Sequence, residues 1–348
     1  MSDQMSTEVP GLDLDRFAEY FSAARPGSVQ GPLTARVIAG GKSNLTYEVT
    51  DGHWTWIVRR PPLGHVLATA HDMAREYTVM TALRDTEVPV PETFALCRDE
   101  AVIGAPFYVM AKVEGTPYRT SAQIAPLGPE RTRTISERMV DTLAALHRVD
   151  PVAVGLADFG RPEGFVARQV RRWKKQLDAS RSRDLAGVDE LHAALETAVA
   201  DGAVESAPGI VHGDYRLDNL LVDDRDRVAA VLDWEMATLG DPLTDVALLI
   251  AYQQMADLGG GAAVADASRA PGFLTNDELL VRYAAGSARD LSAMNVYLGL
   301  AYFKIAVILE GIHFRYTQGQ TVGAGFDTVG AAVEPLVAAG LASLKGHR

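Results

Sequence analysis

The sequence predicts an α+β protein with two lobes, a small N-terminal lobe built on an antiparallel sheet and a large, mainly helical C-terminal lobe. Residues 34–61 alternate in polarity between turn signals, as short strands do, whereas helical periodicity dominates after Gly115. A chain of 348 residues is long enough for both lobes to bury a core. We predict an N-terminal lobe over residues 1–110, a hinge over 111–115 and a C-terminal lobe over 116–348.

The N-terminal elements follow from the period of the apolar residues and from turn signals. Gly40-Gly41 and Asp51-Gly52 are typical of turns between strands, and large apolar side chains recur at helical spacing just after the strand region. The predicted elements are a helix near residues 14–23, strands within 34–61, a helix over 70–84, and strands over 92–97 and 106–113 separated by a turn around Asp99.

The C-terminal half shows helical patterns interrupted by a few short strands. Residues Ile135, Met139, Leu143 and Leu146 lie along one face of a helix. Residues 256–275 show no clear period, which is typical of functional lids or disordered connections. The remaining predicted elements are helices over 165–177, 190–200, 245–255 and 292–315 and two short strand pairs around 210–222 and 228–234.

Composition excludes several classes of protein. The formal net charge of -12 argues against nucleic-acid binding, which depends on neutralising phosphates with Lys and Arg. The single cysteine, Cys97, excludes an intrachain disulfide, and the N-terminal segment lacks the features of an export signal, so we expect a cytoplasmic protein. The longest apolar run, residues 296–309, is interrupted by Lys304 and falls short of the roughly 20 residues that span a bilayer. We therefore expect a buried helix there and no membrane association.

The stretch VHGDYRLDNLLV, residues 211–222, places several polar side chains between two apolar strands. Asp214 and Asn219 are five residues apart, and Asp233 ends the next short strand. Such side chains often only cap a turn. Two carboxylates and a carboxamide on neighbouring loops, however, also suit Mg²⁺, which takes few protein ligands together with phosphate oxygens, as phosphoryl transfer requires. The order of all three along the chain favours a site.

These motifs resemble the signature of the aminoglycoside phosphotransferase and choline kinase family, which is related to protein kinases. The resemblance rests on HGD at 212–214 with Asn219, on LDWE at 232–235, and on GDP at 240–242 with Asp245. It implies a protein-kinase-like fold, with Asp214 as catalytic base and Asn219 and Asp233 as ligands of Mg²⁺. His212 would support the loop. We assign Asp241 and Asp245 to helix capping and the helix dipole.

The N-terminal half carries matching segments. GGKSNLTYEV, residues 40–49, resembles the hairpin that covers the nucleotide phosphates, and PFYVMAKVEG, residues 106–115, resembles the hinge strand. The resemblance implies that ATP is the cofactor, with GTP left open. It also implies cofactor-binding roles for Gly41, Ser43, Asn44, Ile57, Arg59, Glu76, Met110, Lys112 and Val113. Ser43 and Asn44 would offer donors to phosphate, and the backbone around Lys112 would hold adenine.

The segment IVRR departs from the protein-kinase pattern because Arg59 stands where a lysine is expected. Strand alternation puts Ile57 and Arg59 on one face, so Ile57 is placed to cover adenine while Arg59 reaches phosphate and Glu76. A guanidinium offers two parallel bonds where an ammonium offers a point charge, so the geometry must differ. A plain ion pair with Glu76 is the structural alternative for Arg59.

Within the family, the motifs resemble most the branch fused to, or encoded near, acyl-CoA dehydrogenases. That branch implies a phosphotransferase acting on a hydroxyl of a small molecule, such as a hydroxyacyl-CoA. An aminoglycoside-modifying kinase, a catalytically silent nucleotide-binding regulator and a metal-dependent hydrolase are the alternatives, and a homodimer is left open. The basic stretch ARQVRRWKKQ, residues 167–176, is either a solvated face or a contact for an anionic acceptor such as a coenzyme A phosphate.

Overall fold

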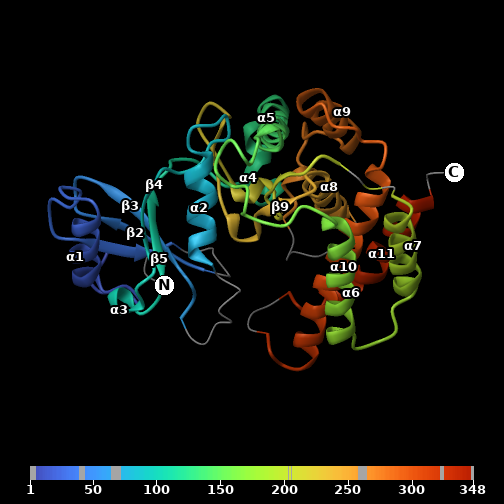
Figure 1. Cartoon of the computed structure of the whole chain (residues 1–348), viewed down its shortest axis with the longest axis horizontal. Coiled ribbons are helices and arrows are strands. Elements are labelled where there is room, and N and C mark those ends of the chain that lie inside the picture. Colours follow the sequence, from blue (N-terminus) through green and yellow to red (C-terminus); the bar gives the residue numbers. More distant parts are fainter. Residues whose placement is uncertain are drawn as a thin grey trace. The chain divides into compact units, whose positions relative to one another are not determined.

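The computed structural model divides into two compact units. The described residues are 5–38, 44–63, 72–202, 204, 206–257, 265–321 and 325–345. The sheet unit comprises Met1–Gly115 together with Ala229–Ala237, and the helical unit comprises Thr116–Val228 and Thr238–Arg348 (Figure 1). The segment 229–237, which the prediction assigns to the larger lobe, thus clusters with the sheet unit. The predicted boundaries at 110 and 115 themselves stay a prediction.

The sheet unit contains one five-stranded antiparallel sheet in the order β1-β2-β3-β5-β4 (Figure 1). Thr93 and Ala95 flank a register irregularity between the two last strands of that order. The sequence-based strands are confirmed, each within a few residues. The bounds are β1 (Thr34–Val37), β2 (Leu45–Thr50), β3 (Thr55–Arg60), β4 (Thr93–Cys97) and β5 (Phe107–Ala111).

One face of this sheet packs against helix α1 (Leu14–Ala24). Phe17 and Phe21 of α1 are fully buried, and their rings contact Phe107 and Trp56 respectively. Helix α1 begins at Asp13, whose carboxylate accepts from the backbone N–H of the third helical residue. The predicted turn around Asp99 is a one-turn helix, α3 (Glu100–Ile103), because Asp99 caps it by accepting from Ala101 N.

The opposite face of the sheet carries the side chains that matter for the site. Strand pairing aligns Ile57 with Met110 and Arg59 with Tyr108, so these four residues share one face. Helix α2 (Met73–Leu83) packs on β4 and β5, and the Tyr108 hydroxyl donates to Glu76 of this helix. The short 3₁₀ helix η3 (Trp234–Met236) also packs on α2. The expected alternation of Ile57 and Arg59 is therefore confirmed.

The helical unit is organised around helix α10 (Met294–Thr317), which packs against four other helices (Figure 1). The predicted helices are confirmed, whereas α9 and α11 were not predicted. The bounds of the remaining elements of this unit are α4 (Ser121–Ile124), η1 (Ala125–Leu127), α5 (Pro129–Arg148), α6 (Phe165–Ser180), α7 (Val188–Ala200), α8 (Leu243–Asp257), η4 (Ala267–Arg269), α9 (Asn276–Ser287), η5 (Val329–Ala332) and α11 (Val333–Lys345).

Helix α10 is apolar on nearly all sides because neighbouring helices surround it. Among the residues that the structure describes, it is the one helix long and apolar enough to cross a membrane, and 72% of its most apolar window is buried inside the protein. A core helix enclosed by other helices has the same composition. The prediction of a buried helix over 296–309 is confirmed.

Short strands frame the polar loop that follows Val211. Strand β6 (Gly209–Val211) pairs antiparallel with β9 (Thr238–Gly240), and the 3₁₀ helix η2 (Leu217–Asn219) leads into β7 (Leu220–Val222). Strand β8 (Val228–Val231) precedes η3 along the chain. Strand β9 was not predicted because three residues, Thr-Leu-Gly, carry no alternation. The residues between β6 and η2 form the loop that contains Asp214.

Candidate active site

The loop after β6 is held by a carboxylate from helix α8. The backbone N–H groups of His212 and Gly213 donate to Asp245 at 2.6 and 2.8 Å. Asp245 lies in the first turn of α8 and is only 1% exposed. Because both carboxylate oxygens accept from the loop backbone, Asp245 fixes the conformation of the residues that precede Asp214. This contact adds to the helix-dipole role that the sequence predicts.

Two histidines complete this support. His147 of α5 lies with Nε2 at 3.3 Å from Asp245. Burial by itself raises the pKa of Asp245, but hydrogen bonds and charge from His147 and His212 outweigh it and hold this pKa below its usual range. Burial lowers the pKa of His147. The Asp214 N–H donates to Nδ1 of the fully buried His212, an arrangement that suits the predicted supporting role.

Asp214 and Asn219 are brought together within the helical unit. The Asn219 side-chain nitrogen donates to the Asp214 backbone oxygen at 2.8 Å and to its carboxylate at 3.1 Å. These bonds assign the amide nitrogen and direct the amide oxygen away from Asp214. An amide oxygen oriented in this way is suited to a divalent cation.

Arg216, which the sequence analysis does not single out, lies between two carboxylates of the same loop. Its Nε is 3.6 Å from Asp214 and its Nη2 is 3.1 Å from Asp218. The guanidinium also lies over the ring of Tyr252, 4.8 Å from the centroid. Burial raises the pKa of Tyr252, and the charge of the Asp214 carboxylate raises it further. Asp214 therefore faces both a cation and a phenol.

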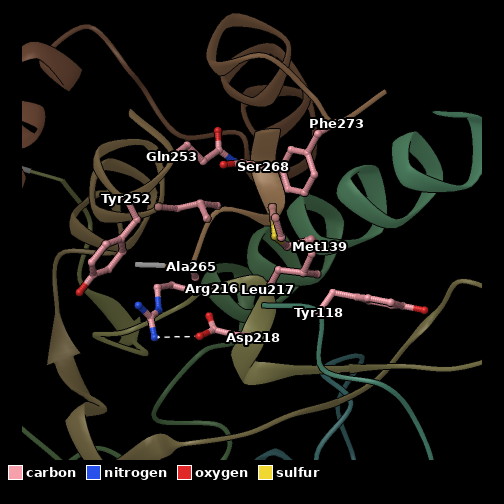
Figure 2. Close-up of a pocket in the computed structure, with 12 residues that line it drawn as sticks. Tyr118, Met139, Arg216, Leu217, Asp218, Tyr252, Gln253, Ala265, Ser268 and Phe273 are labelled. Atoms are coloured by element: carbon pink, nitrogen blue, oxygen red, sulfur yellow. Dashed lines mark hydrogen bonds and ion pairs between the residues drawn. The ribbon is translucent and has the colours of Figure 1, made fainter. Parts of the chain in front are cut away.

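Figure 2 shows Arg216 and Asp218 at one side of a small cavity in this unit, with Tyr252 beside the guanidinium. The cavity measures about 30 Å³, which is room for one or two water molecules. Asp218 Oδ1 and Gln253 Nε2 line it without a hydrogen-bond partner among the described residues. Ordered water is the expected partner of such atoms. Burial raises the pKa of Asp218.

In the sheet unit, Arg59 bridges two carboxylates. Its Nη2 is 2.6 Å from Asp233, and its Nε is 3.4 Å from Glu76. The Arg59 side chain is 13% exposed and that of Glu76 only 1%. The neighbouring Arg60 instead donates to the carbonyl oxygens of Gly11 and Ile103. Of two adjacent arginines, one thus joins the predicted site residues and the other supports the fold.

Glu76 is the most buried carboxylate of this cluster. Burial is the largest cause that raises its pKa, Asp233 and Glu235 raise it further, and Arg59 and Tyr108 lower it in part, so that the pKa is about 7. A glutamate with this pKa is partly protonated near neutral pH. Arg59 therefore acts mainly as the partner of Asp233 when Glu76 carries its proton.

Asn44 makes different contacts from those expected. Its amide nitrogen donates to Glu76 at 3.3 Å and to Glu235 at 3.1 Å, whereas its Oδ1 is buried without a partner among the described residues. A phosphate needs donors, and here both hydrogens of the Asn44 amide point toward carboxylates. Its predicted contact with phosphate would require these bonds to open. Gly41 and Ser43 lie outside the described residues.

The predicted adenine contacts lie on β3, on β5 and just after β5. Ile57 and Met110 are paired across the sheet, and each is 6% exposed. The Lys112 ammonium is 3.5 Å from Glu48 and 3.1 Å from Glu114, and the hydrogen bond with Glu114 is the main cause that raises its pKa. Its side chain is therefore occupied, and the backbone of Lys112 and Val113 is the part suited to hydrogen-bond a base.

The donor chemistry of the predicted metal ligands fits Mg²⁺. Asn219 offers an amide oxygen in the helical unit, and Asp233 offers a carboxylate in the sheet unit. Asp233 adopts a left-handed conformation with φ of 65°, which is uncommon for a residue other than glycine and occurs often at functional sites. Within the described ranges, no group of three or more His, Cys, Asp or Glu side chains could hold a metal ion. The shared metal role of Asn219 and Asp233 stays a prediction.

Comparison with known proteins now decides the family. Residues 34–285 match the model of the phosphotransferase enzyme family, which is well over half of the chain. The chain belongs to this family. The resemblance inferred from HGD, LDWE and GDP is thereby confirmed, and with it the kinase-like fold, with its small antiparallel sheet lobe and its helical lobe.

Curated relatives of the chain include proteins named as acyl-CoA dehydrogenase family members. It is 34% identical over 343 residues to acyl-CoA dehydrogenase family member 11 of Gallus gallus, covering 95% of this chain and 43% of that protein. The human protein of the same name is 33% identical, with 94% and 42% covered. The chain therefore spans less than half the length of these relatives.

Solved structures of similar fold include a crystal structure provisionally described as an aminoglycoside phosphotransferase of Ralstonia eutropha. It is 30% identical with a TM-score of 0.82, covering 99% of each chain. An aminoglycoside phosphotransferase in complex with AMP-PNP and hygromycin B has a TM-score of 0.60 at 15% identity, covering 94% of this chain and 98% of that one. A choline/ethanolamine kinase family protein of Mesorhizobium loti has a TM-score of 0.60 at 18% identity, with 95% of this chain and 99% of that one covered.

Three residues of the candidate site were missed from the sequence or assigned to structure alone. Arg216 follows Asp214 by two residues, and this spacing could have identified it. Asp245 is predicted only as a helix residue. Lys304 of α10 donates to the Gly213 carbonyl oxygen at 3.1 Å, although in the sequence it only interrupts an apolar run. The sequence spacing of Asp245 and Lys304 from the loop gives no signal of these contacts.

Proposed function

We propose that this phosphotransferase transfers the γ-phosphate of ATP, in a magnesium-dependent reaction, to a hydroxyl group of a small molecule. Family membership and the kinase-like fold support the phosphotransferase class. The observation that carries the proposal is the pairing of Asp214 with Asn219 on a loop whose backbone is bound by Asp245. Such a loop presents one carboxylate in a fixed position, as a catalytic base requires.

Most of the predicted residues have a role in this proposal. Asp214 accepts the proton of the acceptor hydroxyl, and Asn219 and Asp233 hold Mg²⁺. The ion would neutralise charge on the phosphates. Arg59 replaces the lysine of protein kinases, while Ile57, Met110 and the backbone of Lys112 and Val113 contact the base. ATP is the proposed nucleotide and GTP the alternative; AMP-PNP bound to a structural neighbour supports nucleotide use.

For the acceptor we propose a hydroxyacyl thioester such as a hydroxyacyl-CoA. The support is the similarity to proteins named as acyl-CoA dehydrogenase family members, over almost the whole of this chain. An aminoglycoside acceptor is the alternative, supported by the fold of the neighbour bound to hygromycin B. A cytoplasmic location without membrane or nucleic-acid partners is part of the same proposal.

The Asp214→Asn variant tests the assigned base. Because the amide cannot accept the hydroxyl proton but keeps the shape of the side chain, turnover should fall by at least about 100-fold while ATP binding changes little. A screen of ATP consumption over hydroxyacyl-CoAs, amino alcohols, aminoglycosides and sugars identifies the acceptor for this assay. Asp224→Asn, at an exposed position of the same region, is the matched control. Near-normal turnover by Asp214→Asn would show that the base is assigned wrongly.

A silent regulator of the same fold is the second candidate, and the arginine at position 59 is the observation that favours it. Calorimetry with ATP and Mg²⁺, followed by the acceptor screen, separates the two. Tight nucleotide binding without turnover on any acceptor would favour the regulator. A metal-dependent hydrolase would differ again, because nucleotide would not stabilise it against heat.

A further inference from the structure

Lys304 places an ammonium group beside the loop that carries Asp214. Its Nζ donates to the Gly213 carbonyl oxygen at 3.1 Å and lies 5.6 Å from the centroid of the buried Trp173 ring. Lys304 comes from α10 and Trp173 from α6, two helices that pack together. The amino group therefore lies between the Trp173 indole and the backbone of the residue that precedes the proposed base.

Among the residues that the structure describes, no ion pair neutralises this cation. Among the described residues its one hydrogen bond is to a neutral carbonyl, and its attraction to Asp214 and Asp245 acts at longer range. Burial lowers the pKa of Lys304, and the neighbouring Arg172 lowers it further. Holding an ammonium in such a place costs free energy unless an anion compensates it. The cost is explained if an anionic ligand binds there.

Arg172 extends the positive charge from Lys304 to the surface. Its guanidinium lies 5.7 Å from the same Trp173 ring and is exposed. By contrast, Lys174 on the same helix forms an ion pair with Asp178, and Arg168 donates to the carbonyl oxygens of Arg161 and Glu163. Two cations on one indole, in a protein of net charge -12, form a local positive site.

We propose that Lys304 and Arg172, arranged around Trp173, bind an anionic oxygen of the acceptor and so select an anionic hydroxy compound. The inference rests on the proposed function, because it uses Asp214 as the base that receives the acceptor hydroxyl. A polycationic aminoglycoside would be repelled by this pair. The anion has two chemical sources, a phosphate of a coenzyme A acceptor or the carboxylate of a free hydroxy acid.

Steady-state kinetics of the full chain test this with three acceptors that carry the same hydroxyacyl group. They are the coenzyme A thioester, the uncharged N-acetylcysteamine thioester and the free hydroxy acid. The variants are Lys304→Met, Lys304→Arg and, as a control, Lys174→Met, whose ammonium already has Asp178 as partner. The readouts are KM for acceptor, KM for ATP, kcat, and calorimetric binding of coenzyme A and of the free acid without nucleotide.

Lys304→Met should raise the acceptor KM about 10-fold to 100-fold for the anionic acceptor that uses the site, because a charged hydrogen bond is worth roughly 1.5–3 kcal/mol. KM for ATP and the acceptor KM for the uncharged thioester should change less than about threefold, and any change in kcat from the lost bond to Gly213 should be the same for all three acceptors. Lys304→Arg should recover much of the loss, and Lys174→Met should behave as wild type. If the acceptor KM rises only for the coenzyme A thioester, the anion that binds Lys304 is a phosphate of coenzyme A. If it rises only for the free acid, the anion is the carboxylate.

If Lys304→Met raised the acceptor KM equally for charged and uncharged acceptors, or raised only the KM for ATP, the proposal would be overturned. The calorimetric binding measurements distinguish failure of the anion site from failure of the proposed function. If wild type turns over no acceptor, yet coenzyme A or the acid binds and Lys304→Met weakens that binding, the anion site stands and the phosphotransferase proposal fails. If transfer occurs but neither binding nor KM responds to Lys304→Met, the anion site fails alone. Circular dichroism shows that the variants fold.

Discussion

Arg59 shows how one residue changes the chemistry expected of a kinase-like sheet. A lysine ammonium acts as a compact point charge, whereas the planar Arg59 guanidinium lies with separate nitrogens against Glu76 and Asp233. The alternative that Arg59 only pairs with Glu76 is therefore too simple, since its shorter contact is to Asp233. In the proposed reaction, Arg59 and Mg²⁺ share the Asp233 carboxylate as partner.

Glu76 should make the free energy of unfolding depend on pH. Its pKa is about 7 in the folded protein and about 4.5 when exposed, so the folded state binds this proton more tightly than the unfolded state. The stability that comes from the protonated group is complete below pH 4.5 and is lost as pH rises through 7. Between pH 5 and 8 the free energy of unfolding of wild type should therefore fall relative to Glu76→Gln, by up to about 3 kcal/mol.

Urea unfolding of both proteins across this range measures the difference. Glu19→Gln, on the exposed face of α1, controls for loss of a glutamate without burial and should track wild type. If the free energy of unfolding changed with pH in the same way for wild type and Glu76→Gln, Glu76 would be fully ionised in the folded protein across this range.

At the scale of elements, the first turn of α8 supports the loop that carries Asp214. Helix α8 and strand β6 meet through Asp245, which accepts from His212 and Gly213, while α5 contributes His147. A single buried carboxylate thus joins three elements. The loop conformation depends on tertiary contacts more than on its own turn residues.

Asp245→Ala should destabilise the protein by about 2–4 kcal/mol, because it leaves buried N–H groups without an acceptor. Asp277→Ala is the matched control: Asp277 also lies in the first turn of a helix, α9, but is not buried. Its loss should cost under about 1 kcal/mol, the size of the helix-dipole effect. Urea unfolding at neutral pH gives both values. A similar small cost for the two variants would contradict the supporting role of Asp245.

Most elements were predictable because their patterns are local. The long amphipathic helices and the strands β2, β3 and β5 repeat apolar residues with clear periods, and the sequence places them within a few residues. Helices α9 and α11 were missed because neither shows a strong apolar stripe beside polar residues. Strand β9 exists only because Thr238 to Gly240 pair with β6, a contact that no local pattern reveals.

At the scale of the whole molecule, the chain crosses between its two compact units more than once. Residues 229–237 follow the catalytic loop in sequence yet cluster with the sheet unit, and they bring Asp233 to Arg59. One proposed metal ligand therefore folds with each unit.

ATP with Mg²⁺ should raise the thermal midpoint by a few degrees, since ligand at 100 times its Kd adds about 2.7 kcal/mol to stability. Adding EDTA should remove most of the rise in thermal midpoint that ATP causes, because Asn219 and Asp233 are proposed to bind the nucleotide phosphates by way of Mg²⁺. Mg²⁺ alone is the control and should have little effect. A shift that EDTA leaves unchanged would argue against the metal role, and no shift with any nucleotide would argue against the cofactor.

The sequence by itself determined the fold class, the family and the identity of Asp214, Asn219, Asp233, Arg59 and Glu76 as candidates, because motif order and periodicity are properties of the chain alone. The tertiary structure decided which groups they meet. Arg59 bonds Asp233, Asn44 turns its donors to carboxylates, Asp245 holds the loop and Lys304 lies beside it. These contacts join residues far apart in the chain, and the free energy of burying a charge depends on neighbours that only folding assembles.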